Sequence, residues 1–457
     1  MKTFDAIVIG SGQGGVPLAT NFAKLGWRVA LIEEGQLGGS CINYGCTPTK
    51  TMIASARIAE AVRRGPQFGV HAGEAKIDMA EIVARKNEIS GAFRSGIEHR
   101  VKNNPNIALY RGRGRFTGPH TVAVNGETLT SDKIFINTGT RPRILPIPGL
   151  DQVPYLTNRN IMDLDRVPSS LIALGGNYLG LEFGQLFQRL GSEVTVVELG
   201  DQIVPREDAE VSQSLKEALE EEGMNFRLGA RTTKIAKTQD GVEVTIEKKD
   251  GTGETLQGSH LLVAIGQTPN TDDLGLDKAG VETDQAGFIR HNGKLETNVP
   301  GVWVLGDVKG GPAFTHVAYD DYLVLTDNLV NGKNRTIDNR MVPYALYTDP
   351  ELGRIGLSER EARAKGYRLK IGSVPMAHVA RAIERGETKG LMKIVVNADN
   401  DRILGATILG PEGGELVQIL MALMMADAPW TLFKDAMFIH PTLAEGFFSL
   451  MADVKAA

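Results

Sequence analysis

Short hydrophobic runs alternate with glycine-rich turns and amphipathic stretches twice along the chain, in residues 4–33 and again in residues 171–198. In each region, a buried-strand pattern runs into a glycine-rich turn, a stretch of helical periodicity follows, and a second strand pattern ends at a glutamate. This order and length are typical of the strand–turn–helix–strand unit of nucleotide-binding α/β domains. We therefore predict two such domains in one chain.

A proline-rich stretch at 141–149 separates the two units and predicts a domain boundary. Further along, a strand pattern at 302–305 ends at Gly306-Asp307, and from about Met341 strands and amphipathic helices alternate without a glycine fingerprint. We predict an α/β fold of two Rossmann-like dinucleotide-binding domains plus a C-terminal α+β domain. The predicted limits are 1–145 and 271–338 for the first domain and its return, 146–270 for the second domain, and 339–457 for the last.

Composition and charge narrow the class of protein. The hydrophobic share of 42% and the charged share of 23% are ordinary for a globular enzyme. The net charge of -5 is spread along the chain, whereas a nucleic-acid-binding protein shows a basic stripe. The apolar run at 417–426 is shorter than the ~20 residues that span a bilayer, and the run at 6–9 lacks a signal-peptide cleavage site. We predict a cytoplasmic protein with no nucleic-acid or membrane partner.

The two cysteines of the chain, Cys41 and Cys46, both follow the first predicted unit. A reducing cytoplasm does not maintain a disulfide framework, and a cysteine-only zinc site needs three or four thiolates, so we predict no metal site here. Thr47 as N-cap and Pro48 at the first helical position predict a helix directly after Cys46, and its dipole would favour a thiolate there. The pair is either two inert buried thiols or a redox centre, and its place beside a dinucleotide unit favours the second.

The first glycine-rich turn matches G-x-G-x-x-G at Gly10, Gly12 and Gly15, with Gly14 as a further glycine. Glycines at these positions allow a tight turn and let backbone N–H groups approach a pyrophosphate at a helix N-terminus. Glu33 follows at about the 20-residue spacing of a carboxylate that binds a ribose hydroxyl. Such a turn can also exist without a ligand, but strand, helix and acid together favour dinucleotide binding.

The second turn keeps Gly175 and Gly180 but has Asn177 where the middle glycine belongs. Asparagine tolerates a left-handed backbone better than most residues, so we expect the turn to form. Glu198 ends the following strand, and a carboxylate there favours the free 2′-hydroxyl of NADH over the 2′-phosphate of NADPH. Arg206 could contact a phosphate and oppose this preference.

Near the C-terminus, His440-Pro-Thr-Leu-Ala-Glu445 allows two interpretations. Thr442-x-x-Glu445 is a capping box that could start a last helix. Alternatively, His440 and Glu445 form a proton-transfer pair, because reduction of a disulfide needs a proton donor that titrates near neutral pH. The local sequence does not decide between them. The other histidines show no metal-ligand spacing.

Together these motifs resemble the flavoprotein disulfide reductases, over nearly the whole chain. The segment Cys41-x-Asn-x-Gly-Cys46-x-Pro-Thr-Lys50 matches the family's most specific motif. The resemblance implies FAD and NAD(P)H as cofactors, and the domain order FAD-binding, NAD(P)-binding, FAD return and dimerisation domain. It also implies a homodimer that passes electrons from NAD(P)H through FAD to the cysteine pair and on to a small-molecule disulfide or oxidant.

Site residues carry over from the resemblance one by one. Cys46 resembles the thiol that faces the flavin, and Cys41 the thiol that exchanges with substrate. Lys50 and Glu182 match an ion pair beside the flavin, and Tyr178 an aromatic lid that moves when the nicotinamide arrives. His440 and Glu445 match the family's acid–base pair, expected to serve the other subunit. The remaining matches are cofactor contacts: Gly114, Thr138, Gly139 and Asp307 to FAD, and Gly266 to NAD.

The motifs do not all point to one subfamily. Residues 47–51, 205–208 and 413–416 look closer to mercuric reductase and to a reactive-chlorine-resistance flavoprotein than to housekeeping dihydrolipoamide dehydrogenase. Mercuric reductases, however, usually carry a C-terminal pair of cysteines, whereas residues 453–457 hold none. A metal-ion reductase or an NAD(P)H oxidase using the same cysteines remains the alternative. A non-catalytic flavin-binding protein is a third possibility, disfavoured because Cys41, Cys46 and His440 are all present.

Overall fold

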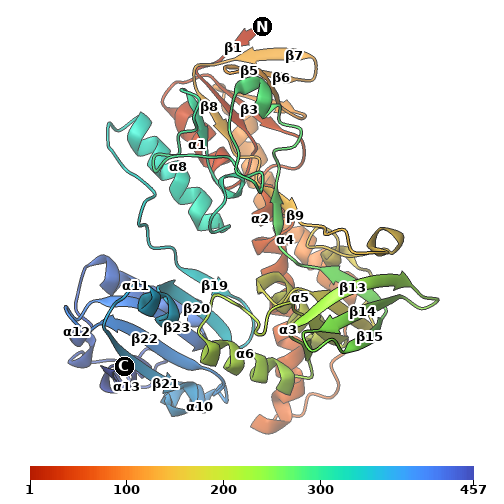
Figure 1. Cartoon of the computed structure of the whole chain (residues 1–457), viewed down its shortest axis with the longest axis vertical. Coiled ribbons are helices and arrows are strands. Elements are labelled where there is room, and N and C mark those ends of the chain that lie inside the picture. Colours follow the sequence, from red (N-terminus) through yellow and green to blue (C-terminus); the bar gives the residue numbers. More distant parts are fainter.

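The computed structural model describes residues 1–457, arranged as three lobes (Figure 1). The first lobe is built on a parallel five-stranded sheet of order β18-β8-β2-β3-β4. Its edge strand β18 follows the second lobe in sequence and pairs with β8, so the chain comes back to the sheet of the first lobe. The strands of this sheet are β2 (Ala6–Ile9), β3 (Val29–Glu33), β4 (Ile107–Arg111), β8 (Ile134–Ile136) and β18 (Val302–Val304).

Helices cover this sheet and extend from it. The predicted first unit is confirmed, with α1 over Gly15–Lys24 between β2 and β3. In Figure 1, α8 (Thr315–Leu329) lies beside α1, and the two helices contact each other. The long helices α3 (Cys46–Arg64) and α4 (Met79–Lys102) run from the first lobe down towards the other two. A small sheet of order β1-β7-β6-β5 completes the lobe: β1 (Lys2–Thr3), β5 (Arg115–Gly118), β6 (Thr121–Val124) and β7 (Glu127–Thr130).

The second lobe repeats the parallel architecture with the strand order β12-β11-β10-β16. Its helix α5 covers Tyr178–Leu190 and begins directly after Asn177. A three-stranded antiparallel sheet lies beside it. The elements of this lobe are β10 (Ser170–Leu174), β11 (Glu193–Val197), α6 (Ala209–Glu221), β12 (Asn225–Arg227), β13 (Ala230–Lys237), β14 (Val242–Lys248), β15 (Gly253–Gly258) and β16 (His260–Val263).

The two lobes are joined by a short antiparallel pair, β9 (Thr140–Pro142) with β17 (Gln267–Pro269). The crossing lies close to the expected boundaries at 145 and 270. The domain limits themselves stay a prediction, because strand pairing does not decide at which residue a domain ends.

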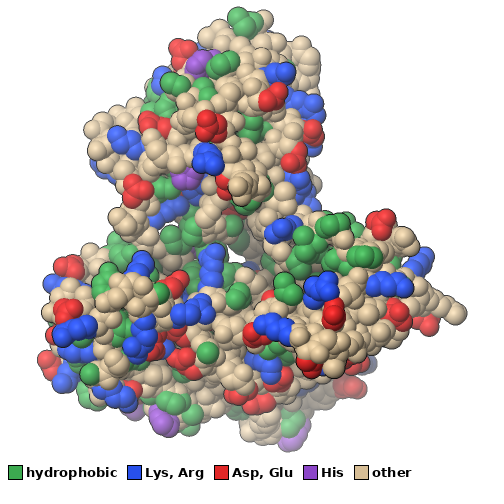
Figure 2. Space-filling view, in the orientation of Figure 1, with side chains coloured by type: hydrophobic (Ala, Val, Ile, Leu, Met, Phe, Trp, Pro, Cys, Tyr) green, Lys and Arg blue, Asp and Glu red, His purple; other side chains and the backbone are tan.

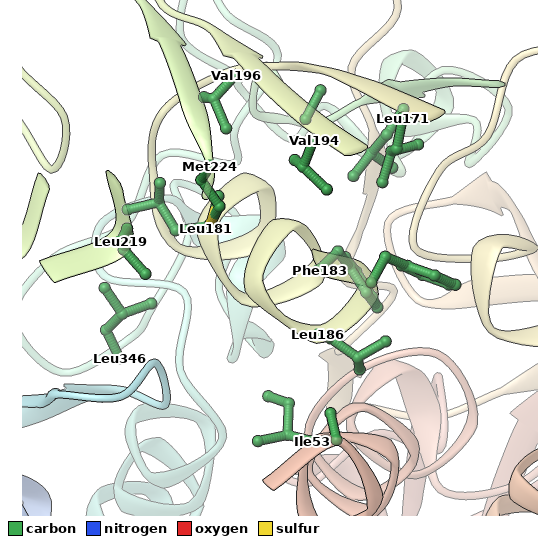
Figure 3. Packing of buried hydrophobic residues seen from close by; sticks show 14 of the residues in the cluster. Ile53, Leu171, Leu181, Phe183, Leu186, Val194, Val196, Leu219, Met224 and Leu346 are labelled. Atoms are coloured by element: carbon green, nitrogen blue, oxygen red, sulfur yellow. The ribbon is translucent and has the colours of Figure 1, made fainter. Parts of the chain in front are cut away.

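Helix α5 is the packing centre of the molecule. Figure 3 shows Phe183 and Leu186 on this helix, with Val194 of its own sheet on one side, Ile53 of α3 on another, and Leu346 of the third lobe nearby. All five side chains belong to one buried cluster. Because large-to-small changes in such a core cost ~3–5 kcal/mol for a phenylalanine, this cluster fixes the lobes relative to one another.

The third lobe is an antiparallel six-stranded sheet of order β19-β20-β23-β22-β21-β24, flanked by helices. It is the predicted α+β domain, and the two preceding lobes are the predicted α/β domains. Its main elements are β19 (Tyr344–Leu346), β20 (Glu351–Gly356), α9 (Glu359–Ala364), β21 (Leu369–Pro375), α10 (Ala380–Glu384), β22 (Leu391–Asn397), β23 (Ile403–Gly410), α11 (Gly413–Met425), α12 (Thr431–Lys434), α13 (Gly446–Ala452) and β24 (Lys455–Ala456).

The single chain leaves large apolar side chains of the third lobe in solvent. Met437 is 99% exposed and Ile439 77%, and both lie just before His440 in the chain. Contiguous exposed apolar residues commonly mark an interaction surface. In no part of the chain is a helix long and apolar enough to cross a membrane.

Candidate active site

A single large cleft lies where the three lobes meet, and the space-filling view shows the molecule hollowed there (Figure 2). Its volume is about 2140 Å³, well above the ~300–1,000 Å³ of a usual ligand pocket. The cleft is lined by both glycine-rich turns, by the cysteine segment and by the start of α8. It therefore has room for two dinucleotides that meet near the cysteines.

The first turn requires glycine at two positions. Gly10 has φ +102°, and a Cβ there would collide with the carbonyl of Asn137. A Cβ on Gly15 would collide with the carbonyl of Gly10, and the Gly15 N–H donates to Asn137 Oδ1 at 2.9 Å. Gly12 lines the cleft, whereas Gly14 packs against α8 behind it. The turn thus presents bare backbone to the cleft at the N-terminus of α1, which suits a pyrophosphate.

The glutamates that end the second strand of each unit occupy equivalent places. Glu33 Oε2 accepts a hydrogen bond from the Ser11 N–H at 2.9 Å, in the first turn. Glu198 Oε2 accepts one from the Gly176 N–H at 2.6 Å, in the second turn. Both carboxylates line the cleft and retain lone pairs for ribose hydroxyls. The structure thus supports the pairing of each turn with its acid.

The second turn reproduces the first at its outer glycines. Gly175 has φ +108° with the carbonyl of Ala264 in the way of any Cβ, and a Cβ on Gly180 would collide with the Gly175 carbonyl. Asn177 has φ −109° and ψ −171°, so the backbone there is extended. The expected turn is therefore present, and it forms with an extended Asn177, from which the chain enters α5 directly. Asn177 is exposed and lines the cleft.

The other residues matched to cofactor contacts also line this cleft. Gly139 (φ +66°) and Gly266 (φ +111°) have no atom within 4 Å of the place of a Cβ. Asp307 begins a short 3₁₀ turn and is half-buried, and burial raises the pKa of its carboxyl. Gly114 and Thr138 lie on the first-lobe side of the cleft. The first lobe thus offers a turn of bare backbone, the Glu33 carboxylate for a ribose and the half-buried Asp307 carboxyl, which together fit FAD. The second turn fits NAD(P)H.

The two cysteines meet in the middle of the cleft. Cys41 lies in α2 (Gly39–Asn43) and Cys46 is the first residue of α3, and both are free thiols. A hydrogen bond from the Cys41 thiol lowers the pKa of Cys46 to about 6, assisted by the hydroxyl of Thr315 at 3.3 Å and by the charge of Lys50. The same bond raises the pKa of Cys41. Cys46 is therefore the thiolate and Cys41 the protonated thiol.

One prediction about this segment was wrong. Thr47 was expected to be the N-cap and Pro48 the first helical residue, but α3 begins at Cys46 with Gly45 as its N-cap and no side-chain cap. The preceding helix α2 ends at Asn43, so only Tyr44 and Gly45 separate the two helices, and the Gly45 backbone (φ −135°, ψ −119°) makes the link. Cys46 therefore lies inside the first helical turn, still within reach of the positive end of the dipole.

An ion pair stands beside the cysteines. Lys50, one turn after Cys46, places its Nζ 2.6 Å from Glu182 Oε2 on α5. Glu182 is only 3% exposed, and its other oxygen accepts from the backbone N–H of Tyr347 at 3.0 Å. Lys50 Nζ also lies 4.6 Å from the centroid of the Tyr347 ring. The expected pairing of Lys50 with Glu182 is thus present, and it adds a positive charge beside the Cys46 thiolate.

Tyr178 is the first residue of α5 and lines the cleft on the side of the second turn. Its ring lies 5.8 Å from that of Tyr344 and 6.1 Å from that of Phe314. Burial raises the pKa of Tyr178 to about 12, so it is a neutral aromatic at physiological pH. This position suits a ring that must move aside for a nicotinamide.

His440 and Glu445 are paired but lie away from the cleft of their own chain. His440 Nδ1 is 2.9 Å from Glu445 Oε2, and His440 is not among the residues that line the cleft. The Thr442 hydroxyl accepts from the Glu445 N–H at 3.2 Å, which is half of a capping box. However, the Glu445 carboxylate turns to the histidine, and α13 begins only at Gly446. His440 and Glu445 are therefore paired, α13 does not begin directly after Thr442, and the proton-transfer role of the pair stays a prediction.

Comparisons with known proteins agree with this geometry. Residues 4–321 match the family model described as pyridine nucleotide-disulphide oxidoreductase, and residues 342–450 match the dimerisation domain of that family. The chain belongs to the pyridine nucleotide-disulphide oxidoreductase family. It is therefore a FAD- and pyridine-nucleotide-dependent oxidoreductase, and it carries the dimerisation domain of its family.

Relatives in the family fall into several groups. The chain is 38% identical to the dihydrolipoyl dehydrogenase of Thermus scotoductus, covering 98% of this chain and 96% of that protein. It is 34% identical to the mercuric reductase of Lysinibacillus sphaericus, covering 91% and 76%. The structure of the HOCl-induced flavoprotein disulfide reductase RclA from Escherichia coli matches with a TM-score of 0.90 at 33% identity, covering 99% and 100%. A Cu(II) complex of RclA matches with a TM-score of 0.91 at 32% identity, covering 100% of both chains.

Several residues of this oxidoreductase were not found from the sequence. Asn137 joins the first turn to Leu305 through its amide, because Nδ2 donates to the Leu305 carbonyl at 2.9 Å. Thr315 contacts Cys46 from a segment 269 positions away. Tyr347 supplies the backbone donor to Glu182. None carries a local motif, although the position of Thr315 soon after Gly306-Asp307 was an available signal.

Proposed function

We propose that this enzyme uses NADH to reduce a Cys41–Cys46 disulfide, which in turn reduces a small-molecule disulfide or oxidant. The observation that carries the proposal is the asymmetry of the cysteine pair in the cleft. Cys46 has a pKa lowered to about 6 by the Cys41 hydrogen bond, Thr315 and Lys50, whereas that of Cys41 is raised. A pair polarised in this way has one cysteine held as a thiolate in the cleft and one protonated cysteine that exchanges once a base removes its proton.

The domains and cofactors follow from the same arrangement. We propose that 1–145 and 271–338 hold FAD, that 146–270 holds the nicotinamide nucleotide, and that 339–457 joins two subunits. When bound, FAD relays the hydride equivalent of the nicotinamide to the disulfide as an electron pair. The first turn and Glu33 would hold its pyrophosphate and ribose, and Asp307 its ribityl chain. Glu198 supports NADH over NADPH, because its negative charge would repel the 2′-phosphate of NADPH.

The chemistry of the chain's own residues is thiol–disulfide exchange. Cys41 attacks one sulfur of the substrate disulfide, and the first thiol leaves as a mixed disulfide forms. The Cys46 thiolate then attacks Cys41 Sγ, which releases the second thiol and restores the Cys41–Cys46 disulfide. Two protons are needed for the two leaving thiolates: one comes from Cys41 and the other is taken up from solvent. Lys50 keeps its positive charge near Cys46 throughout.

Cys41 needs a base, because its proton is held towards Cys46. His440, oriented by Glu445, is a suitable base, but it does not line the cleft of its own chain. We propose that it serves the cysteines of the partner subunit in a homodimer, in which both sites are equivalent by two-fold symmetry. The exposed side chains of Met437 and Ile439 beside it would then be covered by the other chain.

The electron acceptor is tested by a steady-state screen. NADH and NADPH are each supplied with lipoamide, glutathione disulfide, oxygen, Cu²⁺ or thiol-chelated Hg²⁺, for the parent and for Cys41→Ser. We expect turnover with an organic disulfide that requires Cys41. Equal oxygen-dependent turnover of the parent and the variant, with no disulfide reduced, would contradict the proposal and identify an NADH oxidase.

A metal-ion reductase is the second candidate. The match to a Cu(II) complex of RclA favours including Cu²⁺, and the likeness to mercuric reductases favours including Hg²⁺. We expect sustained Hg²⁺ reduction to be poor, because the chain has no thiols besides Cys41 and Cys46 to deliver the ion to them. Rapid, sustained NADH oxidation with Hg²⁺ would contradict this expectation. We also propose a cytoplasmic location, where a reducing milieu suits two free thiols.

A further inference from the structure

Four aromatic side chains form a column at the nicotinamide side of the cleft, and three of them line it. Phe314 stacks on Tyr344 with centroids 5.6 Å apart and an interplanar angle of 10°, and it also stacks on His316 at 5.3 Å and 10°. Tyr178 packs against both Tyr344 and Phe314, at 5.8 and 6.1 Å. The column combines the second lobe, the segment before α8 and the third lobe.

Tyr344 is held at its far end by a buried charge. Its hydroxyl donates to Glu207 Oε1 at 2.6 Å, and Arg354 Nη1 donates to Glu207 Oε2 at 2.9 Å. Glu207 is 0% and Arg354 2% exposed, so the hydrogen bond and the ion pair are both shielded from water. A bond to a buried ionised group is stronger and better oriented than a neutral one at the surface. The ring of Tyr344 therefore has one fixed orientation.

The anchor is connected to the nucleotide turn. The Glu207 N–H donates to the carbonyl of Val204, whose own N–H donates to the carbonyl of Gly176, at 2.9 Å in both cases. Gly176 belongs to the second glycine-rich turn. The residues that fix Tyr344 and the residues that would bind the nucleotide therefore move as one body.

Tyr344 itself stands behind the cleft. The lining includes Tyr178, Phe314 and Ala345 but not Tyr344. Tyr344 thus reaches the cleft through the rings of Tyr178 and Phe314, and a nicotinamide bound in the cleft would meet these rings and not Tyr344 itself.

We propose that Tyr344, fixed by Glu207 and Arg354, is a positioning residue that holds the Tyr178 ring in its unliganded place and so sets how readily the nicotinamide enters. The proposal rests on the function proposed above, in which Tyr178 moves aside for NADH. The contacts of Tyr178 with the column exist before NADH binds and are lost when the ring moves. They therefore favour the state in which the Tyr178 ring has not moved aside. The factor by which they favour that state is the factor by which they weaken NADH binding.

The consequence extends to oxygen. A ring held over the nicotinamide side of the flavin keeps solvent and dissolved oxygen away from it between turnovers. A less firmly held Tyr178 ring has two linked effects. NADH binds more tightly, which favours turnover, and the flavin loses electrons to oxygen faster, which opposes it. A change that only damaged packing would not produce both.

The test compares FAD-loaded dimers of the parent, Tyr344→Leu and Tyr344→Phe. Tyr344→Leu keeps apolar volume but removes the ring, and Tyr344→Phe keeps the ring but frees it from Glu207. Tyr367→Phe is the matched control, because Tyr367 is an exposed tyrosine of the same lobe. Anaerobic stopped-flow reduction by NADH gives Kd and the limiting rate, and oxygen consumption gives the oxidase activity.

For Tyr344→Leu we expect Kd for NADH to fall about two- to tenfold, the range that one aromatic pair supplies. Oxidase activity should rise, Tyr344→Phe should lie between, and Tyr367→Phe should match the parent. Unchanged Kd and oxygen reactivity, or weaker NADH binding, in a folded Tyr344→Leu dimer would overturn the proposal. If instead NADH does not reduce the flavin of the parent, the proposed function itself fails, so the two failures are distinct. If Tyr344→Leu does not fold, a parent-like Tyr344→Phe overturns the proposal.

Discussion

Glu182 accepts from Lys50 through one carboxylate oxygen and from the Tyr347 backbone through the other, at 2.6 and 3.0 Å. Lys50 belongs to the first lobe, Glu182 to the second and Tyr347 to the third. A single carboxylate, 3% exposed, therefore joins all three lobes beside the cysteine pair. The position of the Lys50 charge beside Cys46 depends on the correct packing of the whole chain.

Lys50→Met should slow reduction of the flavin by NADH about 10²-fold, the usual scale for losing one oriented charge in an active site. The buried Glu182 carboxylate would lose its counter-ion, and its uncompensated negative charge would lie beside the flavin site that receives the electrons. The measurement is the limiting rate of anaerobic stopped-flow reduction. Lys102→Met is the matched control, because Lys102 forms an exposed pair with Glu98 on α4. Equal rates for Lys50→Met and Lys102→Met would contradict the assigned role.

Thr315→Val should raise the pKa of Cys46. The Thr315 hydroxyl donates to the thiolate, and its loss favours the protonated form. In the parent, Cys46 is a thiolate above a pKa of about 6 and loses its charge as the pH falls through that value. In the variant, the loss should occur at higher pH. The titration follows the long-wavelength thiolate-to-flavin band of the FAD-loaded enzyme.

Thr315→Ser retains the hydroxyl and should titrate like the parent, which separates the hydrogen bond from packing. A Thr315→Val titration that coincides with that of the parent would show that the hydroxyl does not act on Cys46. Because the two cysteines share a proton, the measured value belongs to the pair.

Glu198→Gln should reduce the preference for NADH over NADPH by about tenfold, since it removes one negative charge near the 2′-position, worth ~1.4 kcal/mol. Glutamine still accepts from the backbone of Gly176, so the turn is preserved. The ratio of kcat/KM for the two nucleotides is the measurement, with the exposed Glu193→Gln as control. A parent enzyme that strongly prefers NADPH would contradict the assignment, and Arg206 would then be the residue to change.

The sequence predicted the parts of the fold and the site whose residues lie close together in the chain at fixed spacings. The two glycine turns, their acids and the cysteine segment have fixed spacings, because a turn, a helix and a strand have fixed lengths. The pairing of Lys50 with Glu182 came from family resemblance, not from spacing. Thr315 and Asn137 were missed because only the folded chain brings them to Cys46 and Gly15.

Local rules also failed where tertiary geometry overrode them. Thr47 has the chemistry of an N-cap, but the tight link from α2 starts α3 at Cys46. Asn177 is a residue type that tolerates a left-handed backbone, yet its backbone is extended where the chain enters α5. In both cases a neighbouring helix determines the backbone, and side-chain preference follows.

Hybrid dimers test the sharing of sites between subunits. Cys41→Ser and His440→Ala should each be inactive as homodimers in disulfide reduction, although His440→Ala should still be reduced by NADH. Mixed under conditions of subunit exchange, they should recover activity, because one of the two sites in a hybrid contains both Cys41 and His440. Absence of recovery despite demonstrated exchange would show that each chain uses its own histidine or none.

The central claim is that Cys41 and Cys46 form a redox centre in series with the flavin, and an anaerobic reductive titration tests it most directly. The FAD-loaded parent should take up two electron pairs per flavin, one by the flavin and one by the disulfide. Cys41→Ser and Cys46→Ser should each take up one pair, and only Cys46→Ser should lack the long-wavelength thiolate band. A parent that takes up a single pair, as the two variants do, would contradict the account.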